Sequence, residues 1–289
     1  MSSLYGHIRK ELCNAGIESG EARAIALLLL EKVCGLTTAE ALMADIEDAA
    51  DGGTKVLEMA KRVANGEPVQ YVIGEADFCG LTLFVKSGVL IPRPETQELV
   101  GWVAEDSINS IENIGRQGKI LDICTGSGCI AIALAKQFPD AEVEAWDVSD
   151  EALEVAKKNT EKCGVRVALR KVDVLDEGAV AKTMRDTLDV IVSNPPYICE
   201  EEAAEIEAHV LEHEPRLALF VPDEDPLIFY RQIACMGMNI LRDGGRLYFE
   251  INRRFGKEVA EMLVGMGYTG VELRQDFYGN DRMIKAIKS

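Results

Sequence analysis

The spacing of apolar side chains changes along the chain. Over the first 70 or so residues they recur every three or four positions, which is the period of an amphipathic helix. The clearest stretch, SGEARAIALLLLEKVCG, covers residues 19–35, and Gly35 is expected to end that helix. A capping box follows, with Thr37 as N-cap and Glu40 three positions later. The pattern predicts a small all-α domain over residues 1–72.

The period then shortens to two. ADFCGLTLFVKSGVLIP contains short alternating strands around Gly80 and predicts a β-hairpin, which places a hairpin linker at residues 73–94. From Lys119 onward, strand and helix patterns alternate in units of about 25–30 residues, a spacing typical of βαβ crossovers. Residues 95–289 are therefore expected to form an α/β domain with a doubly wound, mostly parallel sheet.

In a doubly wound sheet, ligands bind outside the carboxyl ends of the strands. The strand KILDI is followed by a loop and then by a helix pattern, and the loop consists of Cys124, Thr125, Gly126, Ser127 and Gly128. Glycine lets a ligand approach backbone N–H groups closely, and the start of the helix adds partial positive charge. A Gly-x-Gly sequence by itself is also compatible with an ordinary strand–helix turn, so its interpretation depends on the neighbouring strands.

The next two strands end in residues suited to a nucleoside. VEAWD ends at Asp147, about 20 residues after the loop, where a carboxylate can accept hydrogen bonds from both ribose hydroxyls. The following strand pattern ends at VDVL, where Asp173 and Val174 are candidates for an adenine pocket. A complete Gly-x-Gly-x-x-Gly dinucleotide sequence is absent, because Ala131 stands at the third glycine position. These residues predict an adenosine-containing ligand.

The fourth strand, LDVIVS, ends in a stiff polar corner that consists of Asn194, Pro195, Pro196 and Tyr197. Proline fixes φ and cannot continue a strand ladder, so the chain leaves the sheet here in a fixed direction. Together with the glycine loop, the corner resembles the class I S-adenosylmethionine-dependent methyltransferases. Asp122 and the loop are similar to their first motif, Asp147 to their second, and Asn-Pro-Pro-Tyr to the signature of enzymes that methylate a planar, conjugated nitrogen.

This resemblance implies S-adenosylmethionine as cofactor, bound by residues 124–128, Asp147, Asp173, Val174 and Asn194. It also implies that the catalytic residues are Asn194, Pro195, Pro196 and Tyr197. An amide nitrogen is a poor nucleophile, because its lone pair is delocalised. An acceptor from Asn194 and the carbonyl of Pro195 can accept hydrogen bonds from the two N–H groups of the amide and so aim its nitrogen at the methyl group. Tyr197 can stack on the planar group and face the cationic sulfonium, and the prolines make the corner a preorganised clamp.

Four segments extend the resemblance over nearly the whole chain. GEPVQYVIGEADFCGLTLFVKSGVLIPRPETQELV, NPPYI, HEPRLAL and DFYGNDRM resemble the release factor glutamine methyltransferases, with IPRPET the most discriminating piece. The resemblance implies a seven-stranded methyltransferase sheet and a helical N-terminal domain that docks the substrate. It also implies methylation of the glutamine in the Gly-Gly-Gln loop of class 1 peptide chain release factors. Two positions depart from the family: Cys124 stands at a usual glycine, and Gln97 stands at a common glutamate.

Charge and cysteine spacing bear on the alternatives. The net charge is −18 and lysine and arginine form no cluster, so nucleic acid is not expected as a direct substrate. An N6-adenine methyltransferase of DNA or RNA shares the corner sequence and remains an alternative. Two further alternatives are a glutamine methyltransferase of a ribosomal protein and a non-catalytic cofactor-binding scaffold.

The eight cysteines form no C-x-x-C, and His209 and His213 have no evident third ligand, so no metal site is expected.

We expect the protein to be a cytoplasmic monomer. The longest aliphatic run, near Leu27–Leu30, is too short to cross a bilayer. The start, MSSLYGHIRKELC, lacks the basic and apolar segments of a secretory signal. The resemblance implies a class 1 release factor as the partner, and neither a membrane nor a nucleic acid is expected.

Overall fold

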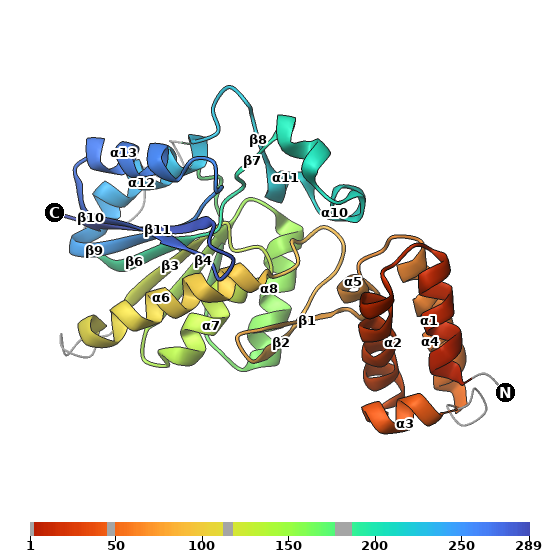
Figure 1. Ribbon diagram of the computed structural model, residues 1–289. Helices are drawn as coiled ribbons and strands as arrows, with labels where there is room; N and C mark the ends of the chain where they lie inside the picture. Colours follow the sequence, from red (N-terminus) through yellow and green to blue (C-terminus); the bar gives the residue numbers. More distant parts are fainter. Residues whose placement is uncertain (1–2, 45–49, 112–117, 177–186) are drawn as a thin grey trace. The chain divides into compact units, whose positions relative to one another are not determined.

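The computed structural model describes residues 3–44, 50–111, 118–176 and 187–289. Within these ranges, no helix has the length and apolar character needed to cross a bilayer. The chain divides into two compact units, Met1–Glu75 with Glu207–His213, and Ala76–Ile206 with Glu214–Ser289. Figure 1 shows the elements of each unit.

The first unit is helical. Its helices are α1 (Leu4–Asn14), α2 (Ser19–Cys34), α3 (Thr38–Met43), α4 (Ala50–Ala64), α5 (Val69–Ile73) and α10 (Ala208–His213). The apolar faces of α1, α2 and α4 meet in a core that includes Leu12, Leu29 and Val56, all fully buried. Gly35 ends α2 in the left-handed region, with φ 67°. The predicted capping box between Thr37 and Glu40 is confirmed at the start of α3.

The second unit contains a seven-stranded sheet in the described residues. In chain order its strands are β3 (Lys119–Ile123), β4 (Glu142–Asp147), β5 (Ala168–Lys171), β6 (Leu188–Ser193), β9 (Leu241–Glu250), β10 (Tyr268–Gln275) and β11 (Asp281–Lys288). Their spatial order is β10-β11-β9-β6-β3-β4-β5. Four of the pairs are parallel, and β11 runs antiparallel to both β9 and β10. The predicted mostly parallel sheet is confirmed, although β5 is shorter than its sequence pattern.

The other elements of this part of the chain are short strands and helices. They are the hairpin of β1 (Glu75–Phe78) and β2 (Leu81–Phe84), the pair β7 (Ile198–Cys199) and β8 (Phe220–Val221), the 3-10 helix η2 (Glu200–Glu205), and the helices α6 (Pro94–Ile111), α7 (Cys129–Gln137), α8 (Asp150–Cys163), α11 (Arg216–Leu219), α12 (Ile228–Ile240) and α13 (Gly256–Gly265). Gly80, with φ 73°, lies at the turn between β1 and β2. The hairpin predicted around this glycine is confirmed.

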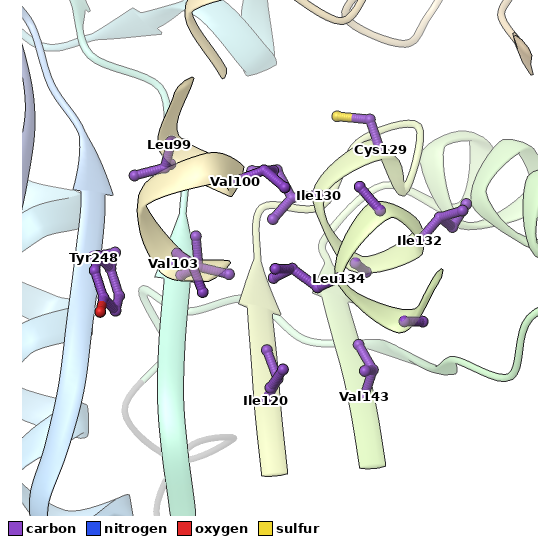
Figure 2. Packing of buried hydrophobic residues seen from close by; sticks show 14 of the residues in the cluster. Leu99, Val100, Val103, Ile120, Cys129, Ile130, Ile132, Leu134, Val143 and Tyr248 are labelled. Atoms are coloured by element: carbon purple, nitrogen blue, oxygen red, sulfur yellow. The ribbon is translucent and has the colours of Figure 1, made fainter. Parts of the chain in front are cut away.

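Helices cover both faces of the sheet. On one face, α7 packs against β3 and β4 and α6 packs against β9, and Figure 2 shows Val103, Leu134 and Ile120 among the side chains of this buried cluster. On the other face, Ile233 of α12 and Val259 of α13 belong to a second buried cluster. Because apolar side chains fill both interfaces, polar groups that can meet a ligand are concentrated at the strand ends.

The order of the strands reverses between β3 and β6. From β3 the chain proceeds outward to β4 and β5, and it then returns to place β6 on the other side of β3. Ile123 at the end of β3 is in register with Ser193 at the end of β6. The two loops that leave these strands therefore begin side by side, at the point where open α/β sheets bind ligands.

Candidate active site

A cavity of about 290 Å³ lies at the carboxyl ends of β3, β4 and β6. Nine residues predicted from the sequence line it, namely Cys124, Thr125, Gly126, Ser127, Asp147, Asp173, Val174, Asn194 and Pro196. Three other predicted residues, Gly128, Pro195 and Tyr197, are not among its lining residues. The structure therefore brings the glycine loop and the polar corner together around one space.

The glycine loop requires left-handed backbone at three positions. Cys124, Gly126 and Gly128 have φ values of 61°, 54° and 82°. At Gly128, an added Cβ would also lie 3.1 Å from both Ala156 Cβ and Ile132 Cδ1, so this glycine also allows α7 to pack closely against α8. Cys124 has a side chain in this region of φ, which costs roughly 1–2 kcal/mol for a residue other than glycine.

Two carboxylates fix the shape of this loop. Asp122 Oδ2 accepts hydrogen bonds from Thr125 Oγ1 at 2.5 Å and from the Ala131 N–H at 3.2 Å. Asp147 Oδ2 accepts one from the Gly126 N–H at 2.8 Å. Burial raises the pKa of Asp122 to about 7, with Asp147 adding to the rise and the two donors opposing it. The pKa of Asp147 is also raised, chiefly by burial. Both side chains are therefore structural parts of the loop.

The same cavity suits a cationic ligand that contains adenosine. Asp147 Oδ1 accepts a hydrogen bond from the Ser149 N–H at 2.9 Å, and each carboxylate oxygen has a further lone pair available to a ribose hydroxyl. Val174 is buried and provides an apolar surface beside Asp173. The charged residues of the lining are Asp147, Glu151, Asp173 and a single cation, Arg93. This excess of carboxylates favours a ligand with positive charge.

The corner after β6 is held by residues from other elements. Asn194 Nδ2 donates to Thr96 Oγ1 at 3.1 Å, and Thr96 Oγ1 donates to Glu250 Oε2 at 2.6 Å. Thr96 lies in the first turn of α6 and Glu250 is the last residue of β9, and both are buried. Within the described residues, no partner is found for Asn194 Oδ1. The amide nitrogen of Asn194 is thus engaged, and its oxygen is available as an acceptor.

Tyr197 is anchored to the same carboxylate. Its hydroxyl donates to Glu250 Oε1 at 3.0 Å, and its carbonyl accepts a hydrogen bond from Asn252 Nδ2 at 3.0 Å. The half-buried side chain packs against the apolar cluster that contains β9 and α12. Burial raises the pKa of the hydroxyl, and the nearby Glu250 adds to the rise. The stacking role that the sequence suggested for Tyr197 remains a prediction.

The IPRPET and HEPRLAL segments form one wall of the cavity. Buried Glu214 accepts hydrogen bonds from the Ile91 N–H at 3.0 Å and from Arg93 Nη2 at 2.5 Å. The lining residues from these segments are Pro92, Arg93, Thr96, Pro215, Leu217 and Ala218. Gln97, whose role the sequence left open, accepts a hydrogen bond from the Cys79 N–H at 2.9 Å. It connects the hairpin turn to α6 and does not line the cavity.

Several residues that hold the site were not predicted. They are Thr96, Asn159, Glu214 and Glu250. Asn159 of α8 donates to the Ser127 carbonyl at 2.9 Å and so supports the glycine loop. Glu250 had a detectable signal, because it is an acidic residue at the end of the strand RLYFE, the same position that identified Asp147. Thr96 and Glu214 lie in the IPRPET and HEPRLAL segments, which the sequence marked without assigning either residue a role, and for Asn159 it offers no comparable local signal.

The histidine pair considered as a metal ligand lies on α10. In the part of the chain that the structure describes, no three His, Cys, Asp or Glu side chains are grouped so as to hold a metal ion. The side chain of His209 instead approaches Glu207, with 3.3 Å between Nδ1 and Oε2.

Comparison with known proteins gives consistent matches along the chain. The family model described as PrmC N-terminal domain matches residues 3–74, and the one described as methyltransferase small domain matches residues 108–217. A release factor glutamine methyltransferase from Bacteroides thetaiotaomicron is 42% identical, with 99% of each chain covered. Another, from Streptococcus pneumoniae, is 36% identical, covering 98% of this chain and 97% of the relative.

A solved structure agrees at the level of the fold. A 16S rRNA methyltransferase from T. thermophilus, in complex with AdoMet and guanosine, superposes with a TM-score of 0.52 at 19% identity. The superposition covers 74% of this chain and 50% of that one. This likeness supports the methyltransferase fold of the α/β sheet.

Proposed function

The chain belongs to the release factor glutamine methyltransferases, and from this premise we propose that it uses S-adenosylmethionine to methylate the side-chain amide nitrogen of a release factor glutamine. The target is the glutamine of the Gly-Gly-Gln loop in a class 1 peptide chain release factor. One observation carries the proposal: Asp147 with its glycine loop and Asn194 with Pro196 line the same cavity.

The glycine-loop side of the cavity fits the cofactor. Asp147 offers acceptors to the ribose, Val174 and Asp173 offer an adenine pocket, and Gly126, which has no side chain, lets the ligand approach the loop backbone closely. When bound, S-adenosylmethionine supplies an electrophilic methyl group on a sulfonium. The chain's own role here is to hold that ligand with the methyl group toward the end of β6.

The corner side fits a primary amide. Asn194 Oδ1 accepts one N–H of the substrate amide. The resemblance assigns the other to the carbonyl of Pro195, a residue that is not among those lining the cavity. Holding both N–H bonds in place aims the nitrogen at the methyl group and removes the need to orient it during the reaction. Glycines before the target glutamine let the substrate backbone approach a narrow site, which a Cβ at those positions would obstruct.

Docking of the factor also requires contacts away from the cavity. We assign this role to the helical residues 1–72, because the cavity is built entirely from the second unit. Remote contacts lower the entropy cost of presenting one loop to the site, and a short peptide lacks them. A full-length factor should therefore be a much better substrate than a Gly-Gly-Gln peptide.

The test is methyl transfer from labelled S-adenosylmethionine, with mass spectrometry to locate the label. The acceptors are a full-length class 1 release factor, the matching peptide, adenine-containing DNA and RNA, and purified ribosomal proteins. The proposal expects one methyl group on the Gly-Gly-Gln glutamine of the factor and weaker labelling of the peptide. Labelling of adenine or of a ribosomal protein, with none on the factor, would replace it with one of the alternatives.

A further inference from the structure

We propose that Thr96 and Glu250 are positioning residues that set the orientation of the Asn194 amide through a directed chain of hydrogen bonds. This inference rests on the proposed function, since Asn194 acts there as the acceptor for the substrate amide. Neither Glu250 nor β9 contributes to the cavity lining, so Glu250 acts through Thr96 and does not touch the substrate.

The direction of the hydrogen bonds from Asn194 through Thr96 to Glu250 follows from the number of protons that each side chain can donate. A threonine hydroxyl has one proton, and Thr96 gives it to Glu250 Oε2. Toward Asn194, the Thr96 oxygen can therefore only accept, and the Asn194 side chain meets it with Nδ2. Rotating the Asn194 amide by half a turn would place Oδ1 against Thr96 Oγ1. Two acceptor oxygens would then face each other with no proton between them. The acceptor Oδ1 is thereby directed away from Thr96, toward the substrate.

Two hydroxyl donors surround the carboxyl of Glu250, since Oε2 accepts from Thr96 and Oε1 accepts from Tyr197. Burial raises the pKa of Glu250 and the charge of Glu95 adds to the rise, whereas the two hydrogen bonds and the charge of Arg282 oppose it. The guanidinium of Arg282 is in turn paired with Asp276, with 3.1 Å between Nε and Oδ2. Because both carboxylate oxygens of Glu250 accept from hydroxyl groups, the proton of Thr96 points to Glu250, and this fixes the polarity of the hydrogen-bond chain.

The arrangement has a consequence for specificity. An acceptor at Asn194 selects a group that presents N–H donors, such as a primary amide nitrogen, and disfavours one that presents a carbonyl or carboxylate oxygen. The Thr96–Glu250 pair thus determines which end of a glutamine side chain faces the methyl donor.

Substitutions at the two positions separate positioning from structural support. Thr96→Ser keeps the hydroxyl and should retain turnover within about threefold, whereas Thr96→Val removes the acceptor for Asn194 and should lower kcat about ten- to a hundredfold. Glu250→Met removes the acceptor for Thr96, which can then donate to Asn194 Oδ1 and turn the amide over. Asp106→Asn is the matched control, because this carboxylate also accepts from a tyrosine hydroxyl of β9, that of Tyr248, but does not line the cavity.

A double variant gives a result that a merely structural role would not produce. In Glu250→Met with Asn194→Asp, Thr96 donates to one carboxylate oxygen and the other stays available to the substrate. Asn194→Asp should therefore partly restore kcat in the Glu250→Met background, although it lowers kcat in the wild type. S-adenosylmethionine affinity and thermal unfolding are measured in parallel, and kcat is compared at saturating cofactor, because Glu250→Met also removes the acceptor of the Tyr197 hydroxyl.

Hydrogen exchange of the Asn194 side-chain amide tests the chain without any substrate. Its NMR signal is assigned by its loss in Asn194→Asp, and the Nδ2 proton that is bonded to Thr96 should exchange slowly in the wild type and in Thr96→Ser. Exchange should be fast in Thr96→Val and Glu250→Met. Equal exchange rates in all four proteins, or no restoration in the double variant, would overturn the inference. A wild type that exchanges slowly but does not methylate the factor would instead contradict the proposed function.

Discussion

The loop after β3 and the corner after β6 lie side by side, yet they are held in different ways. The glycine loop is fixed by Asp122 and Asp147 over sequence separations of 3, 9 and 21 residues. The corner is fixed by Thr96 and Glu250, whose hydrogen bonds span 98, 154 and 53 residues. One half of the site is therefore built largely by neighbouring strands, and the other depends on α6, β6 and β9 meeting correctly.

The difference separates binding from turnover. The loop contributes a glycine backbone without a blocking side chain and the Asp147 carboxylate to the cavity, which together suit a ligand held before the reaction. The corner presents a single oriented amide, and its contribution is realised when the substrate nitrogen approaches the methyl group. Damage to the loop should weaken cofactor binding, and damage to the corner should lower kcat.

The largest effect is expected at the corner. Asn194→Ala removes the acceptor that orients the substrate nitrogen, and kcat should fall by about 10²–10³-fold, the range for loss of one preorganised polar contact. Affinity for S-adenosylmethionine, measured by calorimetry, should change much less. If the variant lost cofactor affinity and kept kcat at saturation, Asn194 would belong to the binding half of the site.

At the loop, Asp147→Ala should weaken cofactor binding rather than lower kcat. Loss of charge-assisted hydrogen bonds to the ribose, at roughly 1.5–3 kcal/mol, corresponds to about ten- to a hundredfold weaker S-adenosylmethionine binding. Calorimetry measures this, with Asp150→Ala as the control because Asp150 is an exposed neighbour that pairs with Lys171. Unchanged affinity in Asp147→Ala would remove this residue from the cofactor site.

The buried carboxylate of the loop should make stability depend on pH. The folded-state pKa of Asp122 is about 7, against a usual value of 3.8, so the unfolded chain releases this proton at lower pH. The wild type therefore loses stability as pH rises from about 4 to about 7, by about 1.4 kcal/mol for each pKa unit of difference.

In Asp122→Asn this ionisation is absent. The free energy of unfolding of the variant, relative to that of the wild type, should increase across the same pH range and level off above it. Urea unfolding at pH 5, 6, 7 and 8 gives the comparison. A difference between the two proteins that does not vary with pH would show that Asp122 titrates alike in the folded and unfolded states.

The smallest effect concerns Cys124. Because its φ of 61° lies in the left-handed region, Cys124→Gly should be more stable than Cys124→Ala by about 1 kcal/mol. Because both variants lack the thiol, the difference between their free energies of unfolding reports the backbone contribution alone. Equal unfolding free energies would mean that the loop relaxes out of this conformation when the thiol is removed.

Features with a local cause could be predicted from the sequence. The helix end at Gly35, the hairpin at Gly80, the glycine loop and the acid at Asp147 each follow from a few neighbouring residues and a strand or helix period. The resemblance to a known family added the seven-stranded sheet and the role of the corner.

The supporting residues could not be predicted in the same way. Thr96 and Glu250 come together because α6 and β9 flank β6, and no local pattern encodes that contact. Asn159 likewise reaches the Ser127 carbonyl only after α8 has packed beside the loop. Side-chain partners of this kind depend on tertiary packing, which strand and helix periods do not specify.

The most direct measurement is a crystal structure of the protein with S-adenosylhomocysteine and a release factor carrying its Gly-Gly-Gln loop. The account predicts ribose hydroxyls on Asp147, and the glutamine amide nitrogen about 3 Å from Asn194 Oδ1 and facing the sulfur. A glutamine bound away from Asn194, or an amide with its oxygen toward Asn194, would contradict it.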